Sequence, residues 1–195
     1  MGLAERGEAA SEKWGKRMPK QKPGKSVQSV ATPKSLIDAI EYRFGPLVWD
    51  LAASHDNAKC ENYITLDEPL PRSPATVFDV ICADSLTVDW HKLSQPCFLN
   101  PEYNAIGVWA KKCYTESLLG AKIFLLVPLT CSKWYCDWIL GKAYEIKLRE
   151  RVTFETHNTP YPKDLCLYWY NCGIRGSECW SWKTTLAKHN GKVST

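Results

Sequence analysis

Apolar and polar positions along the chain change period in blocks, and these blocks predict alternating helices and strands. The first block, TPKSLIDAIEYRFG (32–45), opens with a candidate N-cap, Thr32, continues with Pro33 at the first helical position and closes at Gly45. Its apolar residues recur at helical spacing and form one stripe: Leu36, Ile37, Ile40 and Phe44. A helix is therefore predicted where the folded part of the chain begins.

Short apolar runs separated by polar loops predict strands in much of the remaining chain. The predicted strands are LVWDLAAS (47–54), ENYITLD (61–67), TVFDVICAD (76–84), QPCFLNPEY (95–103), AKIFLLVPL (121–129), YEIKL (144–148), VTFE (152–155) and LCLYWYN (165–171). Two further helices are predicted over 106–120 and 132–142, the second capped by Ser132. One face of the first helix is expected to carry Ile106, Trp109, Cys113 and Leu118.

The order of these elements indicates an α/β fold. Strands that alternate with helices, several of them apolar on both faces, favour a mostly parallel sheet with helices on both faces. Residues 31–172 are expected to form this domain. Residues 1–30 are polar, basic and punctuated by Pro and Gly, which predicts a flexible arm. Residues 173–195 are polar except for Trp180 and Trp182 and predict a C-terminal tail.

Composition places the chain among folded globular proteins, because 45% of its 195 residues are hydrophobic and 24% are charged. No apolar run approaches the roughly 18 residues of a membrane span, and the charged N-terminus lacks the apolar core of a secretory signal. The nine cysteines are odd in number and include neither a C-x-x-C pair nor a zinc spacing. We therefore expect a cytoplasmic protein with reduced, mostly buried thiols, no disulfide framework and no metal site.

Positive charge is concentrated near the N-terminus, although the net charge of the chain is only +4. The segment KWGKRMPKQKPGK (13–25) contains no acidic residue. Its basic residues include Lys16, Arg17, Lys20 and Lys22. Such an arm binds polyanions through counterion release, or serves as a solubilising tail.

Two strand ends carry side chains suited to ligand binding. In a parallel sheet, ligands bind at the carboxyl ends of the strands. The predicted strand 47–54 ends in DLAAS, where the Asp50 carboxylate precedes residues small enough for a ligand to approach the backbone. This suits the ribose or amino-acid part of a cofactor, although an aspartate after a strand often only caps a helix.

The second strand end is the sequence Asn-Pro-Glu-Tyr at 100–103. The side-chain carbonyl of Asn100 and the backbone carbonyl of Pro101 could accept hydrogen bonds from an exocyclic amine, and Tyr103 could stack on an extruded base. The structural alternative is an Asn-Pro turn in which Tyr103 fills the core.

Taken together, the segments resemble the phage-type DNA N6-adenine methyltransferase family, whose members use S-adenosylmethionine. They occur in the family's order: TPKSLIDAIEYRFG, WDLAASHDNAKCENYIT, ADSLTVDW, LNPEYNAIGVWAKK, KIFLLVPLTCSKWYCDWI and VTFETHNTPYPKDLCLYWY. The resemblance covers about residues 31–171. It implies a Rossmann-like methyltransferase fold, S-adenosylmethionine as cofactor, and DNA as the partner, methylated at adenine N6. A phage or prophage source would place the enzyme in the host cytoplasm, with evasion of restriction as one candidate purpose.

The resemblance also implies roles for single residues. Positions that match cofactor-binding elements of the family are Thr32, Pro33, Asp50, Leu51, Ala52, Ala53 and Asn100, although the loop lacks the family's usual glycines. Asn100, Pro101 and Tyr103 match the catalytic Asn-Pro-Pro-Tyr motif. Tyr161, in the loop TPYP (159–162), is a candidate for contact with the target base, whereas the roles of Asp84 and Asp89 in the matching acidic stretch stay open.

Glu102 is the main departure from the family, which normally has proline at this position. A carboxylate here could repel the DNA backbone, accept a hydrogen bond from the amine, favour a cationic cofactor or point into solvent. Three readings therefore stay open. The protein methylates adenine, it methylates another amine such as cytosine N4 or a protein glutamine, or it is a catalytically silent relative that binds nucleic acid or a protein.

Overall fold

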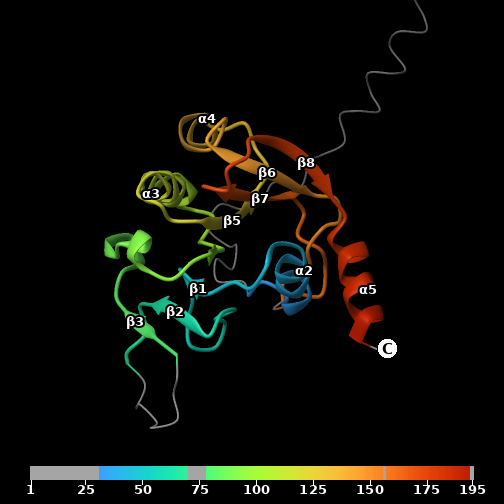
Figure 1. Ribbon diagram of the computed structural model, residues 1–195, viewed down its shortest axis with the longest axis horizontal. Helices are drawn as coiled ribbons and strands as arrows, with labels where there is room; N and C mark the ends of the chain where they lie inside the picture. Colours follow the sequence, from blue (N-terminus) through green and yellow to red (C-terminus); the bar gives the residue numbers. More distant parts are fainter. Residues whose placement is uncertain (1–30, 70–77, 156, 194–195) are drawn as a thin grey trace, which may run out of the picture.

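The computed structural model describes residues 31–69, 78–155 and 157–193, and within these ranges one sheet of eight strands forms the centre of the molecule (Figure 1). The strands are β1 (Trp49–Asp50), β2 (Asn62–Thr65), β3 (Val80–Cys82), β4 (Cys97–Leu99), β5 (Ile123–Pro128), β6 (Ala143–Leu148), β7 (Leu165–Tyr170) and β8 (Gly176–Trp180). Their order is β3-β2-β1-β4-β5-β7-β6-β8. The pairs from β3 to β5 are parallel, β7 runs antiparallel to β5 and β6, and β8 is parallel to β6.

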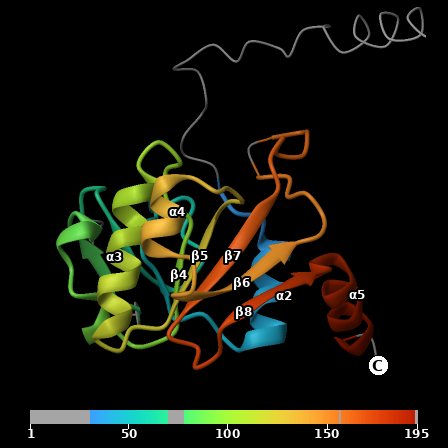
Figure 2. The same cartoon turned by 90° about the horizontal axis from the view of Figure 1, so that it is seen from above.

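Helices cover both faces of this sheet (Figures 1 and 2). They are α2 (Lys34–Phe44), α3 (Ile106–Leu118), α4 (Lys133–Trp138) and α5 (Trp182–Val193), with the 3-10 turns η1 (Ser85–Thr87) and η2 (Trp90–Lys92). Side chains of β5 alternate between two apolar clusters, because successive residues of a strand point to opposite faces. Ile123, Leu125 and Val127 pack with α3, whereas Phe124 and Leu126 pack with α2. The predicted α/β class with a mostly parallel sheet is confirmed.

The first helix begins one residue later than its sequence pattern suggested. Pro33 is the N-cap of α2, with extended backbone, and no side chain caps the helix. The prediction of Thr32 as N-cap is therefore wrong; its hydroxyl accepts a hydrogen bond from Asn100 instead. The predicted exit at Gly45 is confirmed, and its φ of 95° explains the glycine, since side chains disfavour that region.

Three other predictions need correction. The segment VTFE is a loop rather than a strand. Its alternating residues Val152 and Phe154 are buried against the α2 face of the sheet, and this alternation resembles the two-residue period of a strand. Leu118 is exposed rather than on the buried face of α3. Ser132 precedes α4 but makes no capping hydrogen bond.

The cysteines and the C-terminal region also differ from expectation. All nine cysteines are free, but only Cys97, Cys113 and Cys166 are buried, so the expectation of mostly buried thiols is wrong. The polar stretch after Gly173 contains β8, which extends the sheet, and α5, which packs beside α2. No helix within the described ranges is long and apolar enough to span a bilayer.

Candidate functional site

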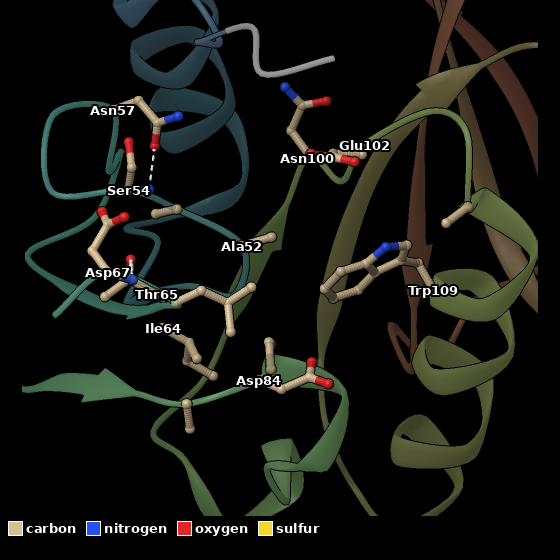
Figure 3. A pocket seen from close by; sticks show the side chains of 15 residues that line it. Ala52, Ser54, Asn57, Ile64, Thr65, Asp67, Asp84, Asn100, Glu102 and Trp109 are labelled. Atoms are coloured by element: carbon tan, nitrogen blue, oxygen red, sulfur yellow. Dashed lines mark hydrogen bonds between the residues drawn. The ribbon is translucent and has the colours of Figure 1, made fainter.

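A cavity of about 340 Å³ opens at the carboxyl ends of β1, β2, β3 and β4 (Figure 3). Its size is within the usual range of roughly 300–1,000 Å³ for small-molecule sites. It is lined by Ala52, Ala53, Ser54, Asn57, Ile64, Thr65, Leu66, Asp67, Ala83, Asp84, Ser85, Asn100, Glu102, Ala105 and Trp109. Both predicted ligand-binding strand ends thus meet at one pocket, as the strand-end rule requires.

Asp50 shapes the loop that forms one wall of this cavity. It ends β1 and is buried; its Oδ1 accepts a hydrogen bond from the amide of Ala52 at 3.3 Å, and its Oδ2 accepts one from the amide of Lys59 at 3.0 Å. Burial raises the pKa of Asp50 to about 6, and the two amides oppose that rise. The carboxylate therefore folds the loop back on itself and stays close to its ionisation point at neutral pH.

The small residues of this loop leave room for a ligand. Ala52 and Ala53 line the cavity, whereas Leu51 is fully buried beneath them in the core. The Asn57 side-chain carbonyl accepts a hydrogen bond from the Ser54 amide at 2.7 Å, which closes the turn that follows. The small alanine side chains leave space beside the backbone of this loop.

Two further carboxylates line the cavity from the loops after β2 and β3. Asp67 Oδ2 accepts a hydrogen bond from the His55 amide at 2.9 Å, which lowers the pKa of Asp67. Asp84 Oδ1 accepts a hydrogen bond from the Leu86 amide at 3.0 Å and caps η1. The sequence analysis did not identify Asp67 and left Asp84 without a role. The available signal for Asp67 was its position just past the strand that follows DLAAS.

Asn100 lies where two cavities adjoin. Besides the main cavity it lines a smaller one, together with Thr32, Asp50, Ala52 and others. Its Nδ2 donates a hydrogen bond to the Thr32 hydroxyl at 3.0 Å, which fixes the side-chain plane. The structure thus brings Thr32, Asp50, Ala52 and Asn100 together around one small cavity. Pro33 lines neither cavity and acts as the helix cap.

The rest of the Asn-Pro-Glu-Tyr segment points in several directions. Pro101 is buried, and Glu102 is exposed and lines the main cavity. Tyr103 does not line it: its ring packs edge-on against Tyr161, with centroids 5.7 Å apart, and touches both core clusters. Burial raises the pKa of Tyr103, so its hydroxyl stays protonated, and this hydroxyl has no hydrogen-bond partner among the described residues.

Glu155 connects the loop that carries Tyr161 to the start of α2 and to the loop after β1. The carboxylate of Glu155 accepts a hydrogen bond from the Lys34 amide at 3.1 Å and pairs with Lys59 Nζ at 2.7 Å. Phe154 packs edge-on against Tyr161 at 5.6 Å. These contacts, with the Tyr103–Tyr161 ring contact, hold the loop around Tyr161 against the segment that follows β4. The arm residues predicted to bind DNA, Lys16, Arg17, Lys20 and Lys22, lie outside the described residues.

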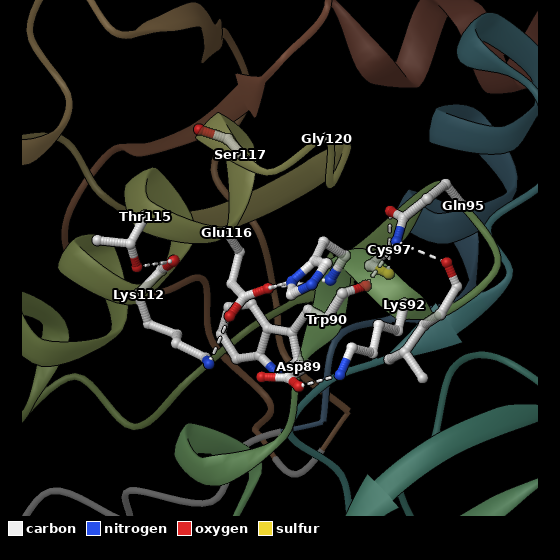
Figure 4. Close-up of polar contacts among 12 residues, drawn as sticks. Asp89, Trp90, Lys92, Gln95, Cys97, Lys112, Thr115, Glu116, Ser117 and Gly120 are labelled. Atoms are coloured by element: carbon white, nitrogen blue, oxygen red, sulfur yellow. Dashed lines mark hydrogen bonds and ion pairs between the residues drawn. The ribbon is translucent and has the colours of Figure 1, made fainter.

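A separate polar cluster lies beneath α3 (Figure 4). Potential ligand atoms of Asp89, His91 and Glu116 lie within 4.8 Å of one another. However, Glu116 pairs with Lys112 at 2.6 Å and with His91 at 2.7 Å, and Asp89 pairs with Lys92 at 2.7 Å. The lysines occupy the positions next to the carboxylates that a cation would need, so the cluster reads as a structural ion-pair network.

The fold and the site together define a class of protein: an α/β domain of methyltransferase-like topology with a cofactor-sized cavity at the carboxyl ends of its parallel strands. The sequence matches the family of DNA N-6-adenine-methyltransferases (Dam) over residues 21–164. Because this match covers most of the chain, the protein belongs to that family, and it is a DNA N6-adenine methyltransferase. No curated protein sequence matches the chain.

Proposed function

We propose that this protein transfers a methyl group from S-adenosylmethionine to N6 of an adenine that has been flipped out of DNA, and that residues 100–103 orient the base. The observation that carries the proposal is the position of Asn100, which lines both cavities at the carboxyl edge of the sheet. A cofactor in the main cavity and an amine held at Asn100 would then be neighbours.

The residues around the cavity fit this cofactor. Asp67 has the position after the second strand from which a carboxylate accepts hydrogen bonds from ribose hydroxyls in dinucleotide-binding folds. Asp84 can accept a hydrogen bond from an adenine amine, and Trp109 offers an aromatic face to the ring. Asp50 and Thr32, in the smaller cavity, suit the ammonium group of the methionine part. When bound, S-adenosylmethionine supplies an electrophilic methyl group on a sulfonium.

The chain's own residues would orient the acceptor amine. The Asn100 side-chain carbonyl and the Pro101 backbone carbonyl accept its two N–H groups, so the nitrogen lone pair is left to face the methyl donor. The Asn100–Thr32 hydrogen bond supports this geometry, because it holds the Asn100 side chain in place with Nδ2 directed at the hydroxyl. No general base is needed in this scheme, since the amine loses its proton after the new bond has formed.

The aromatic pair Tyr103 and Tyr161 would receive the everted base. Stacking on an aromatic side chain is worth about 1–3 kcal/mol per base in single-strand binding. Tyr103 follows Asn100 by three residues, and Tyr161, which packs against Tyr103, is only half-buried. Opening of the Tyr103–Tyr161 contact would expose the stacking face and free the Tyr103 hydroxyl for the base or its phosphate.

The test is a transfer assay with methyl-labelled S-adenosylmethionine and mixed-sequence duplex DNA. After digestion of the DNA to nucleosides, mass spectrometry should find N6-methyldeoxyadenosine. Label in N4-methyldeoxycytidine would show another acceptor amine, and absence of label in DNA, despite bound cofactor, would overturn the proposal.

A further inference from the structure

The main cavity carries an unbalanced negative charge. Three of its lining residues are carboxylates, Asp67, Asp84 and Glu102, and none of its lining residues is Lys, Arg or His. They come from the loops after three different strands and surround the cavity from several sides (Figure 3). Like charges that share a cavity repel one another, so a cationic ligand is favoured there.

The partners of these three carboxylates are neutral groups. The backbone amides of His55 and Leu86 donate to Asp67 and Asp84, and the side-chain amide of Asn104 donates to Glu102 at 3.3 Å. Within the part of the chain that the structure describes, none of the three carboxylates forms an ion pair, although other carboxylates do. The negative charge is therefore available to a ligand.

Of the three carboxylates that line the main cavity, Glu102 lies nearest to Asn100 (Figure 3). It lies two residues after Asn100, whereas Figure 3 draws Asp67 and Asp84 on the far side of the cavity from Asn100. The methyl group must face the amine held at Asn100, so the sulfur that carries it lies at the same end. Proline, which the family normally has at this position, would supply no charge there.

We propose that Glu102 makes the cavity discriminate by charge, so that it binds the sulfonium of S-adenosylmethionine more tightly than the neutral thioether of S-adenosylhomocysteine. This inference rests on the proposed function. In the transfer, the lone pair of the amine forms the N–C bond, the S–C bonding pair returns to sulfur, and the amine proton leaves to solvent. The sulfur thereby loses its positive charge, and the attraction to Glu102 is lost with it. Release of the product follows from this loss.

The discriminating experiment is calorimetric binding of both ligands to the full chain and to Glu102→Gln, which removes the charge but keeps the shape. At an exposed site a single charge contributes modestly, so we expect Glu102→Gln to weaken S-adenosylmethionine binding by about three- to tenfold. Binding of S-adenosylhomocysteine should change less than about twofold. High salt should reduce the preference of the wild type for the charged ligand.

Two controls separate charge from other causes. Sinefungin carries a protonated amine in place of the sulfonium and has no methyl group to transfer. Glu102→Gln should therefore weaken binding of sinefungin about as much as binding of S-adenosylmethionine. Glu61→Gln removes an exposed carboxylate at the opposite end of β2 and should leave both affinities unchanged. Thermal unfolding should show that each variant folds as the wild type does.

Two results would overturn the inference: equal affinities of the wild type for the two ligands, or an equal weakening of both by Glu102→Gln. Failure of the proposed function looks different: no label enters DNA in the transfer assay although cofactor is bound, or neither ligand binds to the wild type.

Discussion

Asp50 is a site residue whose ionisation lowers the stability of the fold. Its pKa of about 6 lies above the ordinary value of 3.8 because the carboxyl is buried. The fold therefore prefers the protonated form, and the stability that Asp50 contributes is complete below pH 4 and is lost as the pH rises through about 6. That loss is on the order of 3 kcal/mol at neutral pH. A side chain that weakens the fold under working conditions is typical of a functional site.

The ionisation of Asp50 gives a pH-dependent prediction for cofactor binding. If the ionised carboxylate holds the ammonium group, affinity for S-adenosylmethionine should rise with pH and level off above about 6. At pH 5 the dissociation constant should be about tenfold higher than at pH 7, since only about a tenth of Asp50 is ionised. Calorimetry at both values checks this. Asp50→Asn should bind weakly at both and lose most of the difference; an undiminished pH dependence in that variant would assign it to another group.

Asn100 carries the prediction about the chemical step. Asn100→Ala removes the carbonyl that orients the amine, and loss of one such preorganised group typically lowers kcat by about 10²- to 10³-fold. Affinity for S-adenosylmethionine should change less than about fivefold. Thr32→Val is the matched variant: it removes the hydroxyl bound by the Asn100 amide but keeps the carbonyl, so kcat should fall less than tenfold. Single-turnover methylation measures both, and full activity in Asn100→Ala would contradict our assignment of the motif.

Among the elements, the pairing of α2 with β8 explains how the C-terminal region joins the domain. Nη2 of Arg43, near the end of α2, donates to both carboxylate oxygens of Glu178 in β8 at 2.8 Å. The guanidinium also lies over the rings of Phe44 and Trp180, at 4.7 and 5.1 Å from their centroids. Cation–π contact and the ion pair therefore act together at a place where both charged side chains are about 30% exposed.

Arg43→Ala should consequently lower the free energy of unfolding by about 1–2 kcal/mol, because it removes packing as well as charge. Arg151→Ala is the comparison, since its pair with Asp164 is longer, at 3.4 Å, and more than half exposed on both sides. That change should cost less than about 0.5 kcal/mol. Urea unfolding of the two variants measures the difference; equal values would mean that the α2–β8 contact is only a surface ion pair.

The elements also show why sequence reasoning reached the centre of the sheet but not its edge. β5 is buried along its whole length, so its apolar run predicts it directly. β8 (GSECW) has one buried residue, and an edge strand of this kind has little hydrophobic pattern to read. In the site, Asp50 and Asn100 follow apolar strands and could be found by the strand-end rule. Asp67 follows β2 and could be found by the same rule, but its contact with the His55 amide could not, because that hydrogen bond joins the loops after β1 and β2 in space.

At the scale of the whole molecule, negative charge is concentrated in the main cavity and positive charge in the N-terminal segment. The main cavity is lined by three carboxylates, whereas residues 13–25 carry six lysines and arginines and no acid. A cavity with negative charge favours a cationic cofactor but repels DNA phosphates that approach its mouth. The attraction that brings DNA to this site must therefore come from elsewhere in the chain, and the basic N-terminal segment has the composition for it.

This division predicts how binding of DNA depends on salt. Changing Lys16, Arg17, Lys20 and Lys22 to Gln in the full chain should weaken duplex binding and reduce the slope of log affinity against log salt by about three to four, because each lost phosphate contact releases one fewer counterion. Affinity for S-adenosylmethionine should be unchanged. Fluorescence anisotropy with a labelled duplex between low and moderate salt gives the slope. The matched control changes four exposed lysines away from the site, Lys92, Lys122, Lys183 and Lys188, to Gln. It alters net charge equally, so an equal loss of slope in the control would show that only net charge matters and that the segment makes no contact of its own.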